Sequence, residues 1–341
     1  MFINPGSVTA DLAVDLGTSF TRVSDRSGSV LLEAPTAVAT QSGSRGRNVV
    51  AVGAAAKKMI GRTPAEIQVI RPVRGGVISD FEATEHLLRD LLREIGGRPL
   101  RRPRLLVCIP SSATEVERRA VQESARAAGS REVSLIINTM AAAIGAELPV
   151  SAPVGSMLVD TGGGRTEVAV MSLGGTVVRK DVAVAGDDLD DAIIDYLRRT
   201  HHVLIGERTA QNLKHHIGAA SAREPAHHMR IRGRALGGGA PREVEITTAQ
   251  IAEAVTDCIQ HIRSVVRDAL QETTPELCSD ILDRGIMVCG GTSQLRGLGA
   301  LLREDTGLPV LEPEFPSQCV ARGAGRVLAD ATLFERVVAA N

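Results

Sequence analysis

Two twelve-residue segments of this chain carry the same pattern of apolar, acidic, glycine and threonine positions. The first is LAVDLGTSFTRV at 12–23, and the second is MLVDTGGGRTEV, which begins 145 residues later at 157. Both fit the pattern apolar-x-V-D-x-G-x-x-x-T-x-V. The separation is about one domain length, so the repeat predicts a duplicated fold. Each copy would present a strand, a glycine turn and a returning strand.

Length and composition agree with two globular domains. The chain has 341 residues, of which 43% are hydrophobic and 23% charged, which is typical of folded proteins. Apolar runs of strand length alternate with amphipathic segments, which predicts a mixed α/β fold. The formal net charge is −1, so bulk electrostatics favour no nucleic-acid partner.

Cysteines and histidines indicate no metal or disulfide framework. The five cysteines are scattered without a CxxC pair, which favours reduced thiols in a cytoplasm. Six of the eight histidines stand in adjacent pairs, whose side chains diverge on a helix or strand: His201-His202, His215-His216 and His227-His228. The start, MFINPGSVTADL, lacks the features of a signal peptide, and no apolar run approaches the ~20 residues of a membrane span.

Several elements can be assigned from local patterns. Strands are expected at 104–110, 156–159 and 286–289. Apolar stripes predict helices over 87–95 and 251–269. Thr114 and Glu117 form a capping-box pattern that opens a helix, and Gly129 is expected to close it.

The glycine turns of the repeat are candidate phosphate loops. Glycines let backbone N–H groups converge on phosphate oxygens, so we expect two half-cradles: Thr18 and Ser19 in the first copy, and Gly162, Gly163 and Gly164 in the second. Asp15 and Asp160 stand at strand ends, where carboxylates can hold Mg²⁺ through its water molecules. The alternative is a pair of β-hairpins with ordinary turn-forming residues.

Two further segments could contact a nucleoside. In IMVCGGTSQLRGLGALL (286–302), Gly290-Gly291 follows a strand and precedes a helix with an apolar face of Leu295, Leu298 and Leu302. This arrangement suits an adenine or ribose, but it is also an ordinary strand–turn–helix. In GERTAQNLKHHIG, Glu207, Gln211 and Lys214 share one helix face, which could grip a ribose or simply be solvated.

Together these motifs resemble the MreB/Mbl family of bacterial actins, within the actin–Hsp70–sugar kinase superfamily. The resemblance runs from about Asp11 to Leu328 and includes the following stretches: DLGT at 15–18, IGRTPAEIQVIRPVRGGVISDF at 60–81, MAAAIGA at 140–146, GSMLVDTGGG at 155–164, GDDLDDAIIDYLRR at 186–199, GERTA at 206–210, CGG at 289–291 and CVARGAG at 319–325. GRTP, GVISDF and CVARGAG favour this family over chaperones and sugar kinases.

The resemblance implies an actin-like ATPase fold of the α/β class, with two duplicated RNase H-like domains around an interdomain nucleotide cleft. Domain I would comprise 1–148 and 317–341, with subdomain IB at about 34–71. Domain II would comprise 149–316, with subdomain IIB at about 186–246. The stretches 138–145 and 320–325 fit the helices that connect the two halves.

The resemblance also assigns residues to an ATP and Mg²⁺ site. Asp15, Gly17 and Thr18, followed by Ser19, fit the first phosphate loop, and Asp160 to Gly164 fit the second. The adenosine side would be formed by Gly290, Gly291 and Thr292 together with Glu207, Ala210, Gln211 and Lys214. Asp15, Asp160 and Asn138 are the candidate catalytic residues.

Five positions depart from the family's pattern. The family places Glu-Pro before the MAAAIG run, where the glutamate positions the attacking water, but this chain has Asn138-Thr139. Asparagine can orient a water but cannot act as a base, which predicts slow or absent hydrolysis with binding retained. Phe20 replaces an asparagine, Arg165 a threonine and Gln211 a glutamate. Arg165 could contact phosphate or face solvent.

The function implied by the resemblance is that of an ATP-dependent filament at the inner face of the plasma membrane, guiding cell-wall synthesis. Its partners would be further copies of itself, transmembrane wall-synthesis adaptors and possible co-polymerising bacterial actins. The alternatives are a weakly hydrolysing scaffold paralogue and a sugar-kinase-type transferase. Peripheral membrane contact would use the apolar start, Met1–Ile3, or the basic loop GGRPLRRPR at 96–104. Pro5 and Gly6 disfavour a long amphipathic helix at the start, and the basic loop could also be merely solvated.

Overall fold

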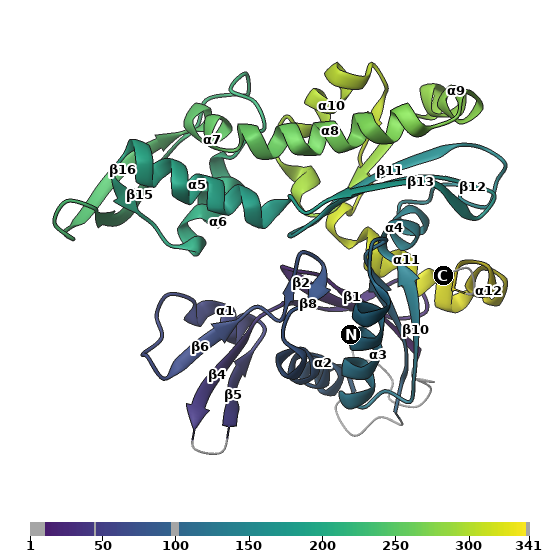
Figure 1. The fold of residues 1–341 in the computed structure, drawn as a ribbon, viewed down its shortest axis with the longest axis horizontal. Helices are drawn as coiled ribbons and strands as arrows, with labels where there is room; N and C mark the ends of the chain where they lie inside the picture. The colour runs from purple at the N-terminus through teal and green to yellow at the C-terminus, as the bar shows by residue number, and fades with distance from the viewer. Residues whose placement is uncertain (1–10, 44–45, 97–101, 339–341) are drawn as a thin grey trace. The chain divides into compact units, whose positions relative to one another are not determined.

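The structure is a computed structural model that describes residues 11–43, 46–96 and 102–338. Its contacts divide the chain into two compact units, shown in Figure 1. Unit 1 comprises 1–153, 172–176 and 318–341, and unit 2 comprises 154–171 and 177–317. Across the described ranges, no helix is both long and apolar enough to cross a membrane.

Unit 1 contains ten strands and six helices within the described residues. The strands are β1 (Asp11–Leu16), β2 (Phe20–Ser24), β3 (Val30–Pro35), β4 (Val38–Gly43), β5 (Gly46–Val52), β6 (Ile67–Ile70), β7 (Val73–Arg74), β8 (Val77–Ile78), β9 (Arg104–Ile109) and β10 (Glu132–Ile137). The helices are α1 (Ala54–Met59), α2 (Phe81–Gly96), α3 (Glu115–Ala127), α4 (Asn138–Gly145), α11 (Cys319–Ala329) and α12 (Ala331–Val338).

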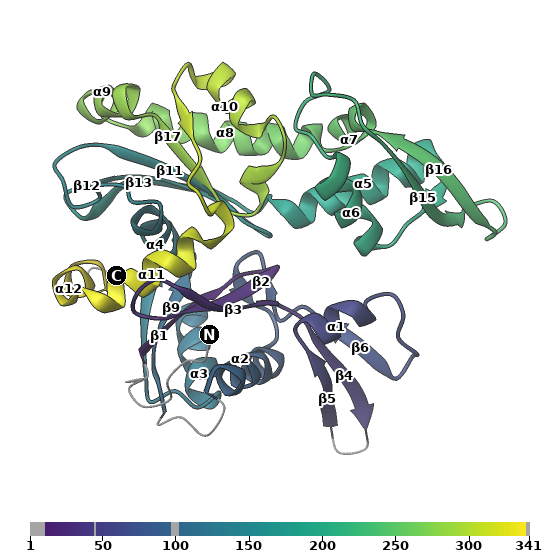
Figure 2. The same cartoon turned by 180° about the vertical axis from the view of Figure 1, so that it is seen from behind.

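The main sheet of unit 1 is covered by helices on both faces. Its strand order is β10-β9-β1-β2-β3, with β1, β9 and β10 parallel and β2 and β3 antiparallel. Leu12, Val14 and Leu16 of β1 point into an apolar core that α2 and α3 complete. The alternate β1 residues face the opposite side, where α11 packs on β1, β2 and β9. Figures 1 and 2 show these two helical layers.

Unit 2 contains the remaining eight strands and six α-helices of the described chain. The strands are β11 (Ser156–Thr161), β12 (Thr166–Ser172), β13 (Gly175–Val182), β14 (Val203–Leu204), β15 (His228–Ala235), β16 (Pro241–Thr247), β17 (Ile286–Cys289) and β18 (Val310–Leu311). The helices are α5 (Gly186–Thr200), α6 (Glu207–Ile217), α7 (Thr248–Ala254), α8 (Thr256–Glu272), α9 (Pro275–Arg284) and α10 (Leu298–Thr306), with short 3₁₀ turns η1 (Thr292–Gln294) and η2 (Pro316–Gln318).

The two main sheets have the same topology, which confirms the duplication predicted from the repeat. The unit 2 sheet runs β18-β17-β11-β12-β13, so each strand matches one of the unit 1 order β10-β9-β1-β2-β3. The β11–β17 and β17–β18 pairs are parallel and β11–β12 is antiparallel, as in the first copy. Each unit adds a separate three-stranded sheet: β5-β4-β6 in unit 1 and β14-β15-β16 in unit 2.

The helices predicted from local patterns are present, with one difference. Helix α2 buries the leucines of the 87–95 stripe, and α3 begins with a capping box at Thr114 and Glu117. Gly129 follows the end of α3 with a φ of 114°, a left-handed conformation that favours glycine. The apolar stripe over 251–269 is divided into α7 and α8 at Val255, and α7 begins with a capping box formed by Thr247 and Gln250. Both helices bury the stripe in one core.

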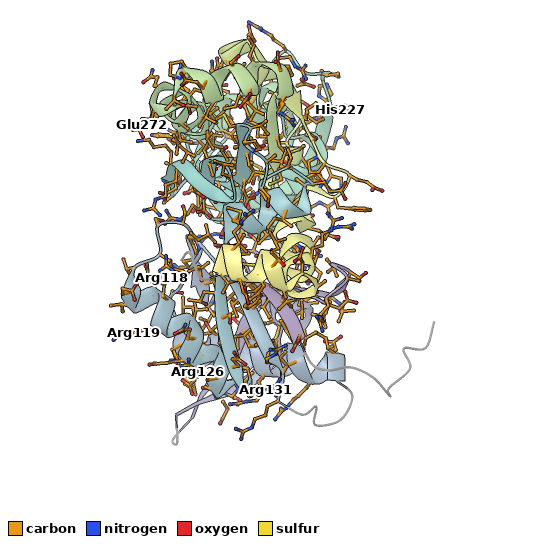
Figure 3. The ribbon with its side chains drawn as sticks, turned by 90° about the vertical axis from the view of Figure 1, so that its right-hand side faces the viewer. Arg118, Arg119, Arg126, Arg131, His227 and Glu272 are labelled. Carbon is orange, nitrogen blue, oxygen red and sulfur yellow. The ribbon has the colours of Figure 1, made fainter. Side chains whose placement is uncertain are left out.

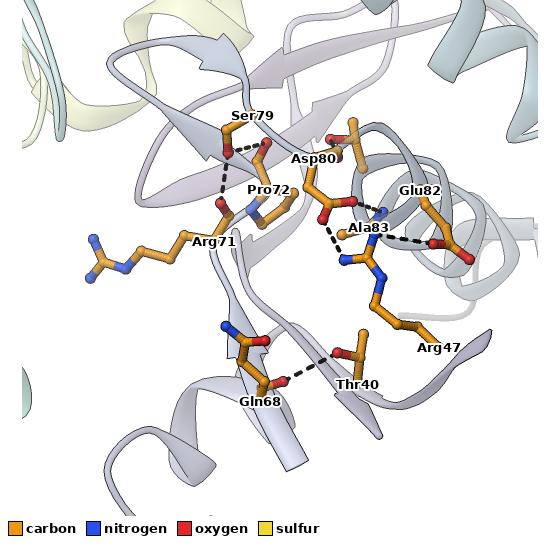
Figure 4. A network of polar contacts seen from close by, with 10 residues as sticks. Thr40, Arg47, Gln68, Arg71, Pro72, Ser79, Asp80, Glu82 and Ala83 are labelled. Atoms are coloured by element: carbon orange, nitrogen blue, oxygen red, sulfur yellow. Dashed lines mark hydrogen bonds and ion pairs between the residues drawn. The ribbon is translucent and has the colours of Figure 1, made fainter. Parts of the chain in front are cut away.

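An arginine ties the β5-β4-β6 sheet to the start of α2. Asp80 accepts a 3.0 Å hydrogen bond from the Ala83 amide and therefore caps the helix. The other Asp80 oxygen accepts a 2.6 Å hydrogen bond from Arg47 of β5, which also lies 3.3 Å from Glu82 (Figure 4). Backbone amide hydrogen bonds and Arg47 together hold the pKa of Asp80 below its usual value, although burial opposes them.

Helices α4 and α11 cross with their backbones in direct contact. A Cβ atom on Gly323 would lie 1.8 Å from the Ala141 carbonyl oxygen, and one on Gly145 would lie 1.9 Å from the Cys319 oxygen. No side-chain rotation can relieve either clash, because the atoms that would be struck belong to backbone. Glycine is therefore required at both positions for these helices to pack.

We expect Gly323→Ala to destabilise the protein although it replaces a glycine within a helix. Helix propensity alone predicts a gain of about 1 kcal/mol, whereas the backbone clash predicts a loss of about 3 kcal/mol. The midpoint of urea unfolding measures the difference. Gly237→Ala is the control, because its Cβ would meet nothing within 4 Å and its stability should change by less than about 0.5 kcal/mol. A stabilised Gly323→Ala protein would contradict the crossing.

Candidate functional site

The first repeat forms a hairpin whose turn is held from both sides. Strands β1 and β2 pair so that Leu16 opposes Thr21, leaving the four residues 17–20 between these paired positions. The Thr36 hydroxyl donates a 2.7 Å hydrogen bond to the Gly17 carbonyl and lies 2.9 Å from the Thr21 hydroxyl. The Gly76 amide donates a 2.9 Å hydrogen bond to the Thr18 hydroxyl. The turn is therefore shaped by hydroxyl groups and not by apolar packing.

Asp15 is a buried carboxyl two residues before Gly17, the first residue of this turn. Only 8% of the residue is exposed, and burial raises its pKa to about 6, against the opposing effect of Arg22. The nearest guanidinium nitrogen of Arg22 lies 3.6 Å from the carboxylate. Arg22 offsets only part of the cost of burying the ionised Asp15 carboxylate, so the carboxylate favours an additional cation close by.

The second repeat forms an equivalent hairpin in unit 2. Thr161 opposes Thr166 across β11 and β12, as Leu16 opposes Thr21 in the first copy. The hydroxyls of Thr161 and Thr166 lie 2.9 Å apart, and Thr166 donates to the Val184 carbonyl. Asp160 precedes the turn and is 9% exposed, like its counterpart Asp15. The two turns are thus the same length and have a carboxyl at the same position.

The triple-glycine turn of unit 2 is fixed through its carbonyl groups. The Gly162 carbonyl accepts hydrogen bonds from the Gly186 amide (3.2 Å) and from the Thr292 hydroxyl (2.7 Å). The Gly163 carbonyl accepts one from the Asp187 amide at 2.7 Å. Among the described residues, the amides of Gly163 and Gly164 donate no hydrogen bond within the protein. Two amides are therefore available to an anion, which is the chemistry of a phosphate loop.

The strand β17 ends against this turn. Gly290 has a φ of 91°, and a Cβ atom there would lie 2.2 Å from the Thr161 oxygen and 2.6 Å from an Asp160 carboxylate oxygen. A side chain at this position would displace the Asp160 carboxyl. A Cβ on Gly291 would meet nothing within 4 Å, so that side of the turn is open.

Helix α6 contributes one cation to the same region of unit 2. The Lys214 ammonium lies 2.9 Å from Asp190 and donates a hydrogen bond to the Gly186 carbonyl, next to the glycine turn. The Gln211 side-chain amide donates a 3.0 Å hydrogen bond to the Glu207 carboxylate, one turn earlier on the helix. Ala210 is fully buried in the core of unit 2, so it can offer a ligand no exposed side chain.

Asn138, which the sequence predicts to occupy the water-positioning site, opens helix α4 in unit 1. Ile137 caps the helix without a side-chain hydrogen bond, and Asn138 is half-buried. Thr139, in the position where the family has proline, is 1% exposed. Its hydroxyl has no hydrogen-bond partner among the described residues. The helix start thus combines a half-accessible amide with a buried hydroxyl.

The structure alters two expectations about individual side chains. The apolar face expected to contact an adenine, Leu295, Leu298 and Leu302, is 8% exposed or less and belongs to the core of unit 2. Hydrophobic burial accounts for that face, so it is not available to a base. Arg165 forms an ion pair with Asp181 of β13, so its side chain does not simply face solvent.

Several residues that build the site were not predicted. Gly186 and Asp187 open α5 and hold the glycine turn, and a Cβ on Gly186 would lie 2.8 Å from the Thr292 hydroxyl. Asp190 holds Lys214. The signal was the GDD sequence at 186–188, three residues after the end of β13, since glycine followed by acids is typical of a helix start. Thr36 and Gly76 carry no such local signal.

Two further predictions concern surfaces. The apolar start, residues 1–6, and the central part of the basic loop, 97–101, lie outside the described residues.

Across the described ranges, no group of three or more His, Cys, Asp or Glu side chains could hold a metal ion.

Comparison with known proteins identifies relatives that all belong to one family. Residues 9–336 match the MreB/Mbl protein family. The chain is 47% identical over 327 residues to the cell shape-determining protein MreB of Escherichia coli K12, covering 95% of this chain and 94% of that protein. It is 39% identical over 321 residues to the cell shape-determining protein Mbl of Bacillus subtilis 168, covering 93% and 95%.

Solved structures show the same fold. The ADP-bound crystal structure of MreB5 from Spiroplasma citri superposes with a TM-score of 0.89 at 29% identity, covering 97% of this chain and 98% of that one. An AMPPNP-bound structure of the same protein gives 0.87. The MamK double helical filament gives 0.79 at 22% identity, covering 94% and 99%, and shows the fold alone. The architecture is therefore actin-like.

We expect Asp15→Asn to stabilise the nucleotide-free, metal-free protein at about pH 8 but not at about pH 4.5. The folded-state pKa of about 6 lies above the ordinary 3.8, so the charged carboxyl costs stability progressively as pH rises between these values. Asparagine removes that cost, up to about 3 kcal/mol. Urea midpoints at both pH values measure the effect.

Asp305→Asn is the control of opposite sign. Hydrogen bonds from Arg263 lower the pKa of Asp305 in the folded protein. The charged Asp305 carboxylate therefore stabilises the fold, and this stabilisation is lost only on acidification. Asp305→Asn should therefore destabilise at about pH 8. An Asp15→Asn protein that is destabilised equally at both pH values would contradict the burial argument.

Proposed function

Because the chain belongs to the MreB/Mbl family, we propose that it is an ATP-binding bacterial actin that forms cytoskeletal filaments and acts in determining cell shape. The proposal is supported by relatives named as cell shape-determining proteins and by MreB5 structures bound to ADP and AMPPNP. The observation that carries it is the pair of equivalent hairpins, each with a buried aspartate before a four-residue connection rich in glycine and hydroxyl residues.

We propose that the two turns bind the phosphates of the nucleotide. Gly17, Thr18 and Ser19 form the first loop, and Gly162, Gly163 and Gly164 the second. The unused amides of Gly163 and Gly164 support this role for the second loop. Gly290, Gly291 and Thr292, together with α6, would take the adenosine. Lys214, which is ion-paired with Asp190, donates a hydrogen bond to the Gly186 carbonyl next to the second loop and so helps to fix the backbone there.

Asp15 and Asp160 are the residues that fit Mg²⁺. Both are carboxylates at strand ends, and Mg²⁺ is usually bound through one or two carboxylates with water molecules and substrate phosphates. When bound, the ion would neutralise charge on the phosphates. The closeness of Gly290 to Asp160 leaves the second carboxyl no room to move toward β17, which holds it in place.

We propose that hydrolysis is weak because Asn138 replaces a glutamate. Its amide can donate or accept a hydrogen bond and so orient a water molecule, but it cannot remove a proton. Asn138 is the first residue of α4 and is half-exposed, so a water molecule can reach its side chain. Binding without efficient turnover would give filaments that persist after ATP is bound.

Self-assembly is proposed from the filament-forming neighbour. The MamK structure is a double helical filament, and it covers 94% of this chain with the same fold. We propose homopolymer filaments, with a co-polymerising bacterial actin as an additional partner. A protein with weak hydrolysis would then act as a scaffold within mixed filaments. A sugar-kinase-type transferase is the less favoured alternative, since it needs a carboxylate base near a sugar pocket.

We also propose peripheral contact with the inner face of the plasma membrane and, through transmembrane adaptors, with wall synthesis. An arginine-rich edge of unit 1 supports the membrane contact: Arg118, Arg119 and Arg126 on α3 and Arg131 before β10 follow one side of the unit (Figure 3). The Arg131 amide donates a hydrogen bond to the carbonyl of Pro103, which belongs to the described end of the basic loop. Basic side chains near anionic lipid contribute about 1 kcal/mol each.

The test of the proposed function is phosphate release from Mg-ATP, with sedimentation of the same samples. We expect the native protein to pellet with Mg-ATP and to release phosphate slowly. Asn138→Glu should raise turnover about a hundredfold by restoring a general base. Asn138→Gln is the matched control, because it keeps an amide and should leave turnover low.

Each outcome separates the alternatives. Native turnover equal to that of Asn138→Glu would contradict weak hydrolysis and leave a dynamic ATPase filament. A native protein that pellets without turnover would favour the scaffold. If neither the native protein nor Asn138→Glu pellets with Mg-ATP or releases phosphate, the proposed function itself is contradicted.

A further inference from the structure

The start of helix α4 lies at the same edge of the main sheet of unit 1 as the first turn. Asp15 of β1 and Ile136 of β10 both pair with Cys108 of β9, and the three strands are parallel. Gly17 and Asn138 each come two residues after these paired positions, so both lie just beyond the carboxyl ends of the strands. Open α/β sheets bind ligands at this edge. The start of α4 is therefore part of the candidate site within unit 1.

Thr139, the second residue of α4, has a buried hydroxyl that the described residues leave without a hydrogen-bond partner. The residue is 1% exposed. A threonine hydroxyl in or next to a helix often donates to the carbonyl four residues earlier. This bond is formed in the present chain by Thr84, Thr200, Thr256, Thr273 and Thr306. For Thr139 the corresponding carbonyl belongs to Leu135 of β10, which is a strand, so the helical geometry that the bond needs is absent.

An internal water molecule is the partner that the Thr139 hydroxyl requires. A buried hydroxyl without a hydrogen bond destabilises a folded protein, and internal water molecules commonly satisfy such groups. The Cβ of a helical residue tilts toward the helix N-terminus, so the Thr139 side chain is directed toward the edge of the sheet. No side chain caps α4, and the helix dipole at its start favours an oxygen atom. The water would therefore lie at the helix start that carries Asn138.

The orientation of the Asn138 amide decides whether it can hold an attacking water molecule. The amide oxygen accepts hydrogen bonds, whereas the NH₂ group only donates them. To leave a lone pair of the attacking water directed at a phosphorus atom, Asn138 must accept a hydrogen from that water. Its NH₂ group must then face an acceptor on the other side. A water molecule bound to the Thr139 hydroxyl is such an acceptor.

We propose that Thr139 is a positioning residue: its hydroxyl holds a buried water molecule at the start of α4, and this water accepts a hydrogen bond from the NH₂ group of Asn138. The Asn138 oxygen then faces the attacking water. This inference rests on the proposed hydrolysis of ATP. It adds that the turnover of this chain depends on Thr139, although Thr139 touches neither the nucleotide nor the attacking water.

The test is single-turnover phosphate release from Mg-ATP by the full chain, with the protein in excess. Thr139→Val keeps the shape of threonine without the hydroxyl. We expect it to lower the rate about tenfold, which corresponds to the loss of one hydrogen bond, and to leave ATP affinity within about twofold of native. Thr139→Ser keeps the hydroxyl and should give a rate within about threefold of native. A rate that falls equally in both variants overturns the inference.

Two controls separate positioning from packing. Ser124→Ala removes a buried hydroxyl of α3 that is likewise unpartnered among the described residues, and it should leave the rate unchanged. In an Asn138→Glu background, Thr139→Val should change the rate by less than about twofold, because a carboxylate has two acceptor oxygens and no NH₂ group to direct. A loss of about tenfold in that background as well would mean that Thr139 does not act through the Asn138 amide.

Urea unfolding of the same variants decides the matter if native turnover is too slow to measure. A hydroxyl that is hydrogen-bonded to a water molecule stabilises the fold, so Thr139→Val should lower the urea midpoint. A midpoint raised by Thr139→Val would mean that the hydroxyl is buried without a partner, and would overturn the inference. Failure of the proposed function is distinguishable, because phosphate release would then be absent from both the native protein and Asn138→Glu, while the urea midpoints still test the water.

Discussion

The backbone contact between α4 and α11 is the constraint on which unit 1 depends. Gly145 and Gly323 let the two helices touch, and α11 then packs on β1, β2 and β9. The Ser24 hydroxyl donates to the Ala321 carbonyl and joins the hairpin to the same helix. The placement of Asn138 at the start of α4, relative to Asp15 on β1, therefore follows from two glycines that take no part in chemistry.

The duplicated hairpin separates what a backbone provides from what side chains provide. Both copies place an aspartate before a turn, and threonine hydroxyls brace both turns. The turns themselves differ, since the second is held through glycine carbonyls by α5 and Thr292, and the first through Thr18 and Thr36. The residues facing the two aspartates differ more, because Arg22 and Glu167 carry opposite charges. Duplication has thus preserved geometry while the electrostatics diverged.

The repeat allowed much of this to be predicted. Its spacing gave the duplicated fold, and the motifs around it gave the MreB/Mbl family, both of which are confirmed. The apolar face of Leu295, Leu298 and Leu302 was misjudged, because a stripe that a core buries and a stripe that a ligand covers look alike in sequence. The binding roles of the site residues remain predictions, as do the domain boundaries.

The sequence by itself determined the strand–turn–strand units, the helix caps and the family, since these follow from local patterns and matched motifs. Only the tertiary structure decided which distant groups meet: Thr36 with the first turn, Asp187 and Thr292 with the second, and Arg22 with both Asp15 and Glu33. The physical reason is strand register and helix contact. These join residues far apart in the chain, and no local pattern records which of them will face each other.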